Sequence, residues 1–272
     1  QEERLGTAHA VLQAGPALAD HAGDVLVLYG DTPFVRPETL EAMREARGRA
    51  DVVVLGFDAA DPEARYGRLA TDGDRLLRIV EWKDADAATR AGRLCNSGVM
   101  LAEGAFLFDL LRGVGNDNAA GEYYLTDVVA LAAGRGLSAT VVRCGEAETL
   151  GVNSRAELLA AEAALQARMR AEAVADGVSI PLPETVVFAY DTVVGRDATV
   201  EPYVVFGPGV TVESGARIRA FSHLEGCHVS RGATVGPFAR LRPGAELAGE
   251  VHVGNFVEIK AATLHEGAKV SH

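Results

Sequence analysis

The sequence is poor in cysteine, in basic residues and in long apolar runs, and each shortage excludes a class of protein. Three cysteines, Cys95, Cys144 and Cys227, are an odd number without short spacing. They indicate neither a disulfide framework nor a zinc site, so the reducing cytosol is the expected compartment. With 26 basic and 38 acidic residues the formal charge is −12. Nucleic-acid backbones and anionic membranes would repel such a chain, so neither is expected as its main partner.

No apolar run approaches the roughly 18 residues that a membrane-spanning helix needs, and no signal peptide is visible. The composition, 48% hydrophobic and 24% charged over 272 residues, is typical of a soluble globular protein with room for two domains. The chain begins at Gln1 rather than Met and ends at His272 in the middle of a repeating pattern. Both termini are therefore expected to be cuts.

The first half of the chain alternates short apolar runs with helical patterns. Strands are expected at DVLVLYGDTP, ADVVVLGF and LSATVVRC, and helices at PETLEAMREARGR and EYYLTDVVALAAGRG. This alternation predicts an α/β domain, Rossmann-like, with a mostly parallel sheet over residues 1–153. Ligands of such sheets bind beyond the carboxyl ends of the strands, which gives the polar turn YGDTP functional weight.

A different pattern follows. Residues 154–176 are rich in Ala, Leu, Glu and Arg and predict one long linker helix. Beyond it, large apolar residues recur in steps of six, with a slip of one residue after Leu224 and a second after Ile259. The positions are Val194, Val200, Phe206, Val212, Ile218, Leu224, Val229, Val235, Leu241, Leu247, Val253, Ile259, Leu264 and Val270. This period predicts a parallel β-helix over residues 177–272. An antiparallel sandwich is the alternative, although it has no reason to keep a six-residue register.

The motifs LGTAHAV, YGDTP, YGRL, IVEWKD, NSGVM, GEYYLTD and GVNSR, followed by GPFARLRPGAELAGEVHVGNFVEIK, resemble a known family in their order and wording. The family is that of the bacterial bifunctional N-acetylglucosamine-1-phosphate uridyltransferase/glucosamine-1-phosphate acetyltransferases. The resemblance covers essentially the whole chain and implies a left-handed β-helix of hexapeptide repeats for the second half.

The resemblance implies two reactions and their substrates. The β-helix domain transfers acetyl from acetyl-CoA to glucosamine 1-phosphate. The α/β domain then joins the resulting N-acetylglucosamine 1-phosphate to UTP, releasing pyrophosphate and UDP-N-acetylglucosamine for peptidoglycan and lipopolysaccharide synthesis. The family's β-helices associate as homotrimers with active sites between subunits, so a trimer is expected here as well.

Uridylyl transfer needs a divalent ion to offset charge on the phosphates, and Mg²⁺ prefers few carboxylates with water and phosphate oxygens. The resemblance implies Mg²⁺ ligation by Asp31 and Asn153. Read without the family, Asp31 is a turn cap before Pro33, and Asn153 is a helix N-cap.

Further residues match the family's substrate site. Gln1, Gly6 and Thr7 match positions that hold the uracil, although LGTAH alone reads as an ordinary helix start. The positions around the amino sugar are matched by Tyr29, Gly30, Gly67, Glu81 and Asn96. Taken alone, Glu81 and Lys83 read as a solvated pair at a strand end.

The family opens with a glycine-rich loop that carries a basic residue and cradles the triphosphate. No such loop occurs in this sequence. Uridylyltransferase activity is therefore expected to be absent or severely reduced in a chain that begins at Gln1, and restoring an N-terminal segment should raise it.

Acetyl transfer to an amine needs a base, and a histidine suits this role because its ordinary pKa of about 6.5 leaves it largely neutral in the cell. Counted from EIK, His272 falls at the position of the family's proton acceptor. Arg242 and Lys260 match residues that grip the sugar phosphate. They are 18 residues apart, one full coil, so they are expected on adjacent coils of one face. Without the family they read as solvated charges, and His272 as a frayed end. Because later coils that bind acetyl-CoA are missing, no acetyltransferase activity is expected of this fragment.

Two alternative functions remain open at this stage. One is a nucleotidyltransferase for another sugar 1-phosphate, which ATP or GTP preference would reveal. The other is a non-catalytic fragment that binds a sugar nucleotide and turns nothing over.

Overall fold

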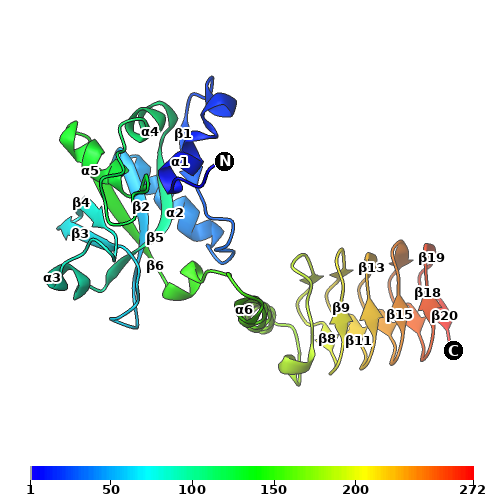
Figure 1. The fold of residues 1–272 in the computed structure, drawn as a ribbon. Helices are drawn as coiled ribbons and strands as arrows, with labels where there is room; N and C mark the ends of the chain where they lie inside the picture. Colours follow the sequence, from blue (N-terminus) through cyan, green and yellow to red (C-terminus); the bar gives the residue numbers. More distant parts are fainter. Residues whose placement is uncertain (1) are drawn as a thin grey trace. The chain divides into compact units, whose positions relative to one another are not determined.

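The computed structural model describes residues 2–272, so the predicted uracil contact of Gln1 lies outside the described residues. The chain divides into two compact units, Gln1–Ser154 and Arg155–His272 (Figure 1). Each unit has its own hydrophobic core.

The first unit is built on a six-stranded sheet in the order β1-β5-β2-β6-β4-β3. Its strands are β1 (Asp24–Val27), β2 (Val52–Asp58), β3 (Arg68–Asp72), β4 (Arg75–Val80), β5 (Leu94–Glu103) and β6 (Ala139–Cys144). Its helices are α1 (Thr7–Leu12), α2 (Pro37–Arg47), α3 (Ala87–Arg90), α4 (Gly104–Leu111) and α5 (Asp127–Gly134), with 3₁₀ turns at Gly15–Leu18 and Glu146–Thr149. The predicted α/β class is confirmed.

The sheet is mixed, however, rather than mostly parallel. β2 and β6 pair in parallel, whereas β5 pairs antiparallel with both β1 and β2, so β1, β2 and β6 share one direction. The hairpin of β3 and β4 adds further antiparallel pairs. The three strands expected from the sequence are the ones that share a direction. The expectation was wrong for the sheet as a whole because β5 runs back between two of them.

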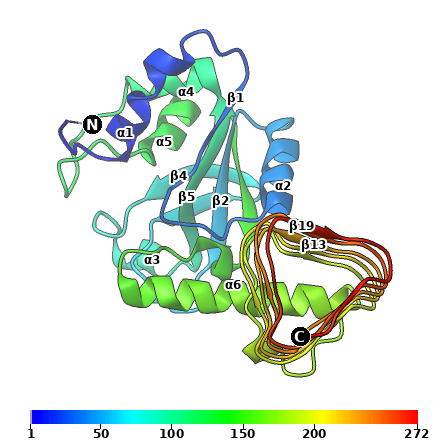
Figure 2. The ribbon, with the colours of Figure 1, turned by 90° about the vertical axis from the view of Figure 1, so that its right-hand side faces the viewer.

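Side chains of β2 reach both faces of this sheet, because successive residues of a strand point to opposite sides. Val52 and Val54 belong to the core beneath α4 and α5, and Val53 and Leu55 to the core beneath α2. Figure 2 shows the resulting three layers, with α2 on one side of the sheet and α1, α4 and α5 on the other. Burial on both faces explains why β2 reads as a continuous apolar run.

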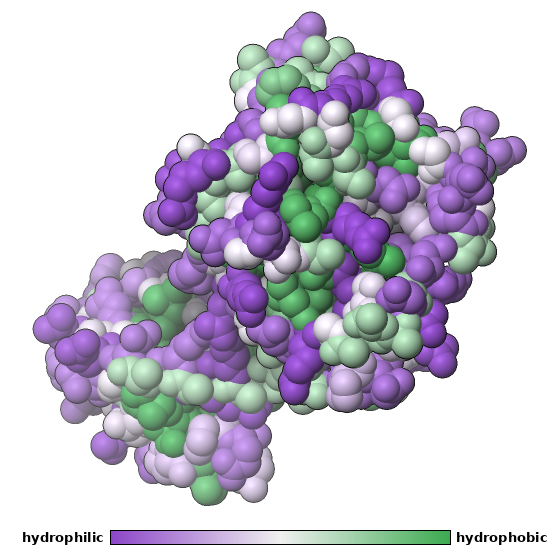
Figure 3. Space-filling model, turned by 90° about the vertical axis from the view of Figure 1, so that its left-hand side faces the viewer, coloured by the Kyte–Doolittle hydropathy of each residue, from purple (hydrophilic) through white to green (hydrophobic). Residues whose placement is uncertain are grey.

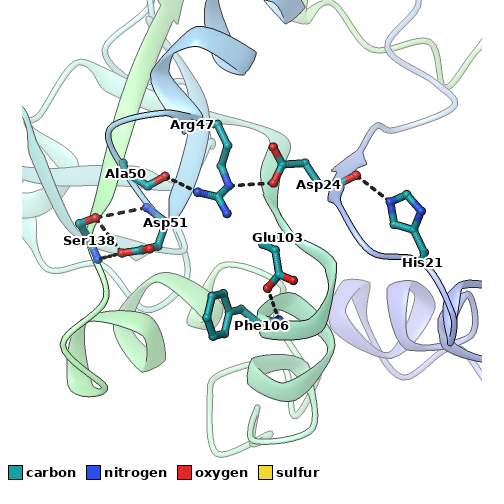
Figure 4. Close-up of polar contacts among 8 residues, drawn as sticks. All are labelled: His21, Asp24, Arg47, Ala50, Asp51, Glu103, Phe106 and Ser138. Atoms are coloured by element: carbon teal, nitrogen blue, oxygen red, sulfur yellow. Dashed lines mark hydrogen bonds and ion pairs between the residues drawn. The ribbon is translucent and has the colours of Figure 1, made fainter.

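Polar contacts anchor the amino ends of the parallel strands (Figure 4). The polar turn YGDTP follows the other end of β1. Asp24, at the start of β1, pairs through Oδ1 with Arg47 Nε of α2 at 3.0 Å. Asp51, just before β2, accepts through Oδ2 from the backbone N–H of Ser138 (2.7 Å) and from its hydroxyl (2.8 Å). These bonds lower the pKa of Asp51, the backbone N–H contributing most. These contacts fix the ends where the strands begin.

The surface of the first unit is mixed in character. On the face that Figure 3 presents, apolar patches are bordered by hydrophilic side chains. Exposed apolar residues such as Leu28 and Phe106 are ordinary for a globular domain. Among residues 2–272 no helix has the length and apolar character needed to span a bilayer.

The second unit is a parallel β-helix preceded by α6 (Arg155–Ala175) and a 3₁₀ turn at Pro183–Thr185. Its strands are β7 (Val193–Val194), β8 (Thr199–Val200), β9 (Val205–Phe206), β10 (Thr211–Val212), β11 (Arg217–Ile218), β12 (His223–Leu224), β13 (Cys227–Val229), β14 (Thr234–Val235), β15 (Arg240–Leu241), β16 (Ala245–Leu247), β17 (His252–Val253), β18 (Glu258–Ile259), β19 (Ala262–Leu264) and β20 (Lys269–Val270). They form three sheets, and the coils viewed end-on in Figure 2 trace a triangle.

The six-residue period is confirmed, because every predicted apolar position is the last residue of one of these strands. Equivalent positions on successive coils pair in parallel, as Ile218 does with Val200 and with Val235. The slip after Leu224 arises because β13 begins only three residues later, at Cys227. The inward residues form one continuous core.

Helix α6 closes the amino-terminal end of this core. Its Met169 and Ala173 pack against the core residues. The buried amide of Gln166 pairs with the backbone of Phe188, donating to its carbonyl at 2.6 Å and accepting from its N–H at 3.0 Å. Repeat folds need such a cap because a terminal coil otherwise exposes its apolar interior.

Candidate functional site

The turn after β1 and the segment after β6 meet where the parallel strands end. The N–H of Val152 donates to the carbonyl of Asp31 at 2.8 Å, which brings the turn YGDTP against GVNSR. Asp31 is exposed. A Cβ added to Gly151 would lie 3.6 Å from the Asn153 Nδ2 and 4.0 Å from the Asp31 carbonyl oxygen. The two residues predicted to hold a metal therefore lie on neighbouring segments of one edge.

Gly6 and Thr7 are fixed by the backbone of residues 123–125. Tyr123 donates its N–H to Leu5 (2.8 Å) and accepts from the N–H of Ala8 (2.9 Å). Gly6 has a φ of 115°, and an added Cβ would lie 2.5 Å from the Tyr123 carbonyl, so only glycine fits. The Thr7 hydroxyl accepts from the N–H of Leu125 at 2.9 Å.

Tyr29 lies against the backbone of β5. A Cβ added to Gly98 would come within 2.2 Å of the Tyr29 ring, so the ring occupies the space that a side chain would need. The pKa of Tyr29 is raised to about 12, chiefly by burial. The charges of Glu81 and Asp31 also raise this pKa, and a hydrogen bond with Thr7 lowers it. The phenol therefore stays protonated and can donate a hydrogen bond.

Gly67, Glu81 and Asn96 lie beside Tyr29 on three adjacent segments. The N–H of Asn96 donates to the Gly67 carbonyl at 2.9 Å. A Cβ added to Gly67 would lie 3.5 Å from Glu81 Oε2, so this carboxylate oxygen lies close beside the bare Gly67 backbone. The other oxygen, Oε1, accepts from the Thr126 hydroxyl at 3.0 Å. Burial raises the pKa of Glu81, the Thr126 bond lowers it, and nearby Asp84 and Asp127 raise it again.

The structure thus gathers four of the predicted residues, Tyr29, Gly67, Glu81 and Asn96, into one cluster, which we call the sugar cluster. Thr7, which is hydrogen-bonded to Tyr29, lies at its border. A pocket of about 250 Å³ adjoins it, lined by Glu81, Trp82, Tyr124 and the cations Arg65 and Lys83. Lys83 therefore borders a cavity, whereas the sequence alone left it as a solvated charge. Gly30 is exposed, with nothing within 4 Å of an added Cβ, and it lines the open side between Tyr29 and Asp31.

Two members of this arrangement escaped the sequence reasoning. Thr126 is 5% exposed and holds Glu81, and Gly98 makes room for Tyr29. Both lie inside the quoted motifs GEYYLTD and NSGVM. A glycine within a strand signals close approach of another group, and this signal could have identified Gly98.

Arg242 and Lys260 lie on adjacent coils of one face, next to the paired residues Leu241 and Ile259. The Arg242 guanidinium is already engaged, since its Nη1 donates to Glu258 Oε1 at 2.9 Å. This bond, with weaker help from the charges of Arg240 and Lys260, lowers the pKa of Glu258. An anionic ligand at this place would compete with Glu258 for the guanidinium.

His272 does not lie with these two cations in the chain. It follows β20, which belongs to the sheet β20-β17-β14-β11-β8, whereas Arg242 and Lys260 follow strands of the sheet β18-β15-β12-β9. These sheets form different faces of the β-helix. His272 is exposed.

The protein donors at the Asp31 edge suit a hard cation only in part. Within residues 2–272, no group of three or more His, Cys, Asp or Glu side chains is placed to hold a metal. One carboxylate and one amide provide oxygen ligands of the kind that Mg²⁺ takes, provided that phosphate and water oxygens complete its octahedron. The donor set therefore fits a metal that arrives with a phosphorylated ligand.

Comparison with known proteins agrees with both units. The family model described as bacterial transferase hexapeptide (six repeats) matches residues 191–226. The chain is 71% identical over 272 residues to the bifunctional protein GlmU of Cereibacter sphaeroides and 61% identical to that of a Jannaschia species. Each alignment covers 100% of this chain and 60% of the relative. These relatives confirm the resemblance inferred from the motifs.

A nucleoside-diphosphate-sugar pyrophosphorylase of Vibrio cholerae RC9 is similar with a TM-score of 0.46 and 16% identity, over 58% of this chain and 65% of that one. That likeness is too slight to carry an argument. The chain spans about 60% of the length of the curated relatives that it matches.

Proposed function

Because the chain matches the bifunctional GlmU proteins over its full length, we propose that it forms part of an enzyme that makes UDP-N-acetylglucosamine. Acetyl would pass from acetyl-CoA to glucosamine 1-phosphate. Uridylyl would then pass from UTP to N-acetylglucosamine 1-phosphate with release of pyrophosphate. This chemistry belongs to the cytoplasm and supplies the synthesis of peptidoglycan and lipopolysaccharide.

The observation that carries the proposal is the sugar cluster at the carboxyl ends of the strands. An N-acetylated sugar presents hydroxyl and amide N–H donors together with a carbonyl acceptor. Glu81 has one oxygen committed to Thr126 and the other beside the bare Gly67, where it can accept from the sugar. The protonated Tyr29 and the amide of Asn96 supply donors, so the cluster has both kinds of partner.

The uracil would lie over the bare backbone of Gly6, with the Thr7 hydroxyl within reach of its edge. The proposed order along the edge, with uracil at Gly6, diphosphate at Asp31 and sugar at Glu81, follows the order of a sugar nucleotide.

Mg²⁺ would be held by Asp31 and Asn153, and when bound it would offset the charge that develops on the phosphates during transfer. The protein side of the reaction is positioning. The sugar cluster would hold the sugar 1-phosphate with its phosphate oxygen facing the nucleotide. Holding both reactants in this geometry lowers the entropic part of the reaction barrier.

In the second unit, Arg242 and Lys260 would hold the sugar phosphate, and His272 would accept the proton of the attacking amine. These residues follow strands of different sheets, so we propose that a second copy brings His272 to the cations of its neighbour. A trimer with its axis along the β-helix would build three such sites.

Isothermal titration of the chain with sugar nucleotides in the presence of Mg²⁺ tests the nucleotidyl half. UDP-N-acetylglucosamine should bind at least ten times more tightly than ADP-glucose or GDP-mannose, and Glu81→Gln should remove most of that affinity. Glu38→Gln, an exposed carboxylate on α2, is the matched control and should change nothing. Preference for the adenine or guanine compound would instead assign the chain to another class of sugar nucleotidyltransferases.

A further inference from the structure

Arg68 is a buried cation that the proposed site does not use. It is 2% exposed and is the largest fully buried side chain in the part of the chain that the structure describes. A guanidinium keeps its charge in proteins, and a charge removed from water is costly unless polar groups surround it. A side chain of this kind needs an explanation beyond filling space.

The surroundings of Arg68 consist of carbonyls, a thiol and an aromatic face. Its nitrogens donate to the carbonyls of Tyr66 (2.8 Å), Ala64 (2.9 Å), Pro62 (3.1 Å) and Arg90 (3.3 Å) and to the Cys95 Sγ (3.1 Å). Its Cζ lies 4.6 Å from the centre of the Trp82 ring. Among residues 2–272 no carboxylate comes within ion-pair distance of it. The guanidinium therefore ties separate segments together instead of neutralising an acid.

Each side-chain partner of Arg68 is next in sequence to a residue of the sugar cluster. Arg68 follows Gly67, Trp82 follows Glu81, and Cys95 precedes Asn96. Arg68 and Cys95 pair directly across β3 and β5, and the neighbouring Asn96 N–H bonds to the Gly67 carbonyl. Successive side chains of a strand point to opposite faces. Arg68 and Cys95 thus lie one residue behind Gly67 and Asn96, whereas Trp82 follows Glu81 and lines the same pocket. We call Arg68, Trp82 and Cys95 the clamp.

Arg90 extends the clamp to α3. Its Cζ lies 5.0 Å from the centre of the Trp82 ring, and its Nε donates to the Trp82 carbonyl at 3.2 Å. The only tryptophan of the sequence is thus fixed at both its ring and its backbone, directly after Glu81. Small movements of the guanidinium would be passed to Glu81 through this residue.

We propose that Arg68 is a positioning residue that sets the spacing of Gly67, Glu81 and Asn96, and so the fit of the sugar half of a sugar nucleotide; this rests on the function proposed above. The uracil end, at Gly6 and Thr7, is held by different contacts, with residues 123–125. The clamp should therefore govern recognition of the sugar and not of the nucleotide.

The test compares Arg68→Lys and Trp82→Leu with the wild-type chain. Lysine keeps the charge but cannot bond four carbonyls, and Trp82→Leu removes the ring while leaving Arg68 in place. Leu107→Ala, which opens a cavity at a fully buried position in α4, controls for general loss of stability. Titration measures the affinities for UDP-N-acetylglucosamine and for UDP. Hydrogen exchange measures the rate at the backbone amide of Asn96 relative to amides of β2.

In both clamp variants the affinity for UDP-N-acetylglucosamine should fall at least tenfold while that for UDP changes less than twofold. Asn96 exchange should accelerate at least tenfold relative to β2, and neither selective effect should occur in Leu107→Ala. Equal losses for both ligands, or Asn96 exchange that only follows β2, would overturn the proposal. If the wild-type chain binds no sugar nucleotide but the selective exchange is seen, the strand-positioning role stands and the proposed function fails.

Discussion

Replacing Thr126 by valine tests the account of Glu81 through stability alone, without any ligand. Thr126 is 5% exposed, and its hydroxyl donates to Glu81 Oε1 at 3.0 Å. Valine has nearly the same shape, so the substitution removes the hydrogen bond without opening a cavity. A hydrogen bond to a charged group contributes about 1.5–3 kcal/mol, and one between neutral groups about 0.5–1.5 kcal/mol.

The effect of Thr126→Val should depend on pH, with a sign that follows from the raised pKa of Glu81. A carboxyl whose folded-state pKa is raised contributes most to stability below its unfolded pKa of about 4.3 and progressively less as the pH rises through the folded value. Loss of the Thr126 bond raises the folded pKa further. The difference between variant and wild type should therefore grow from about 1 kcal/mol at pH 4.5 to about 2 kcal/mol at pH 8.

Urea unfolding followed by tryptophan emission provides the assay, because the single tryptophan, Trp82, directly follows Glu81 and reports on the first unit. Thr126→Ser keeps the hydroxyl and is the matched control. A free-energy difference that does not change with pH, or an equal loss in Thr126→Ser, would show that the hydroxyl does not hold the ionised carboxylate.

Three further predictions concern other parts of the molecule. Gly98→Ala should displace the Tyr29 ring, because Gly98 has a φ of 90° and an added Cβ would lie 2.2 Å from that ring. We expect the free energy of unfolding to fall by about 1–3 kcal/mol and sugar-nucleotide binding, measured by calorimetry, to be lost. Unchanged binding would contradict this packing. The hydrogen bonds from Ser138 lower the pKa of Asp51. The carboxylate therefore stabilises the fold above its unfolded pKa of about 3.9, and this stabilisation is lost as the pH falls through its folded-state pKa. Asp51→Asn should be about 1.5 kcal/mol less stable than wild type at pH 6, and its urea midpoint should fall less steeply between pH 6 and pH 2. Glu258→Gln should free the Arg242 guanidinium and strengthen the binding of inorganic phosphate about two- to fivefold, because exposed charges interact only weakly. The affinity is measured by NMR titration. An unchanged or weaker affinity would mean that the anion binds elsewhere.

The β-helix could be predicted from the sequence almost residue by residue, because each short strand ends in a large apolar residue and the coils repeat the same geometry. The spacing of Val200, Ile218 and Val235 is enough to predict that they pair on successive coils.

The strands of the first unit were harder to predict from the sequence. β5 was not among the strands expected from the sequence, and its antiparallel direction is decided by tertiary packing between β1 and β2.

The sugar cluster shows the same limit. The resemblance identified Glu81 and Asn96, but their partners come from distant segments, as Thr126 does from 45 residues away. Arg68 could not be singled out in advance, because an arginine at a strand start is ordinarily exposed and nothing local indicates that it is buried. Such residues become visible only once the strands are assembled.

The most direct test of the account is a crystal structure of the chain with UDP-N-acetylglucosamine and Mg²⁺. The account predicts the sugar within hydrogen-bond distance of Glu81 and Asn96, the diphosphate beside Asp31 and the uracil over Gly6. A sugar nucleotide bound elsewhere on the first unit, with no ligand atom near Glu81 or Asn96, would contradict it.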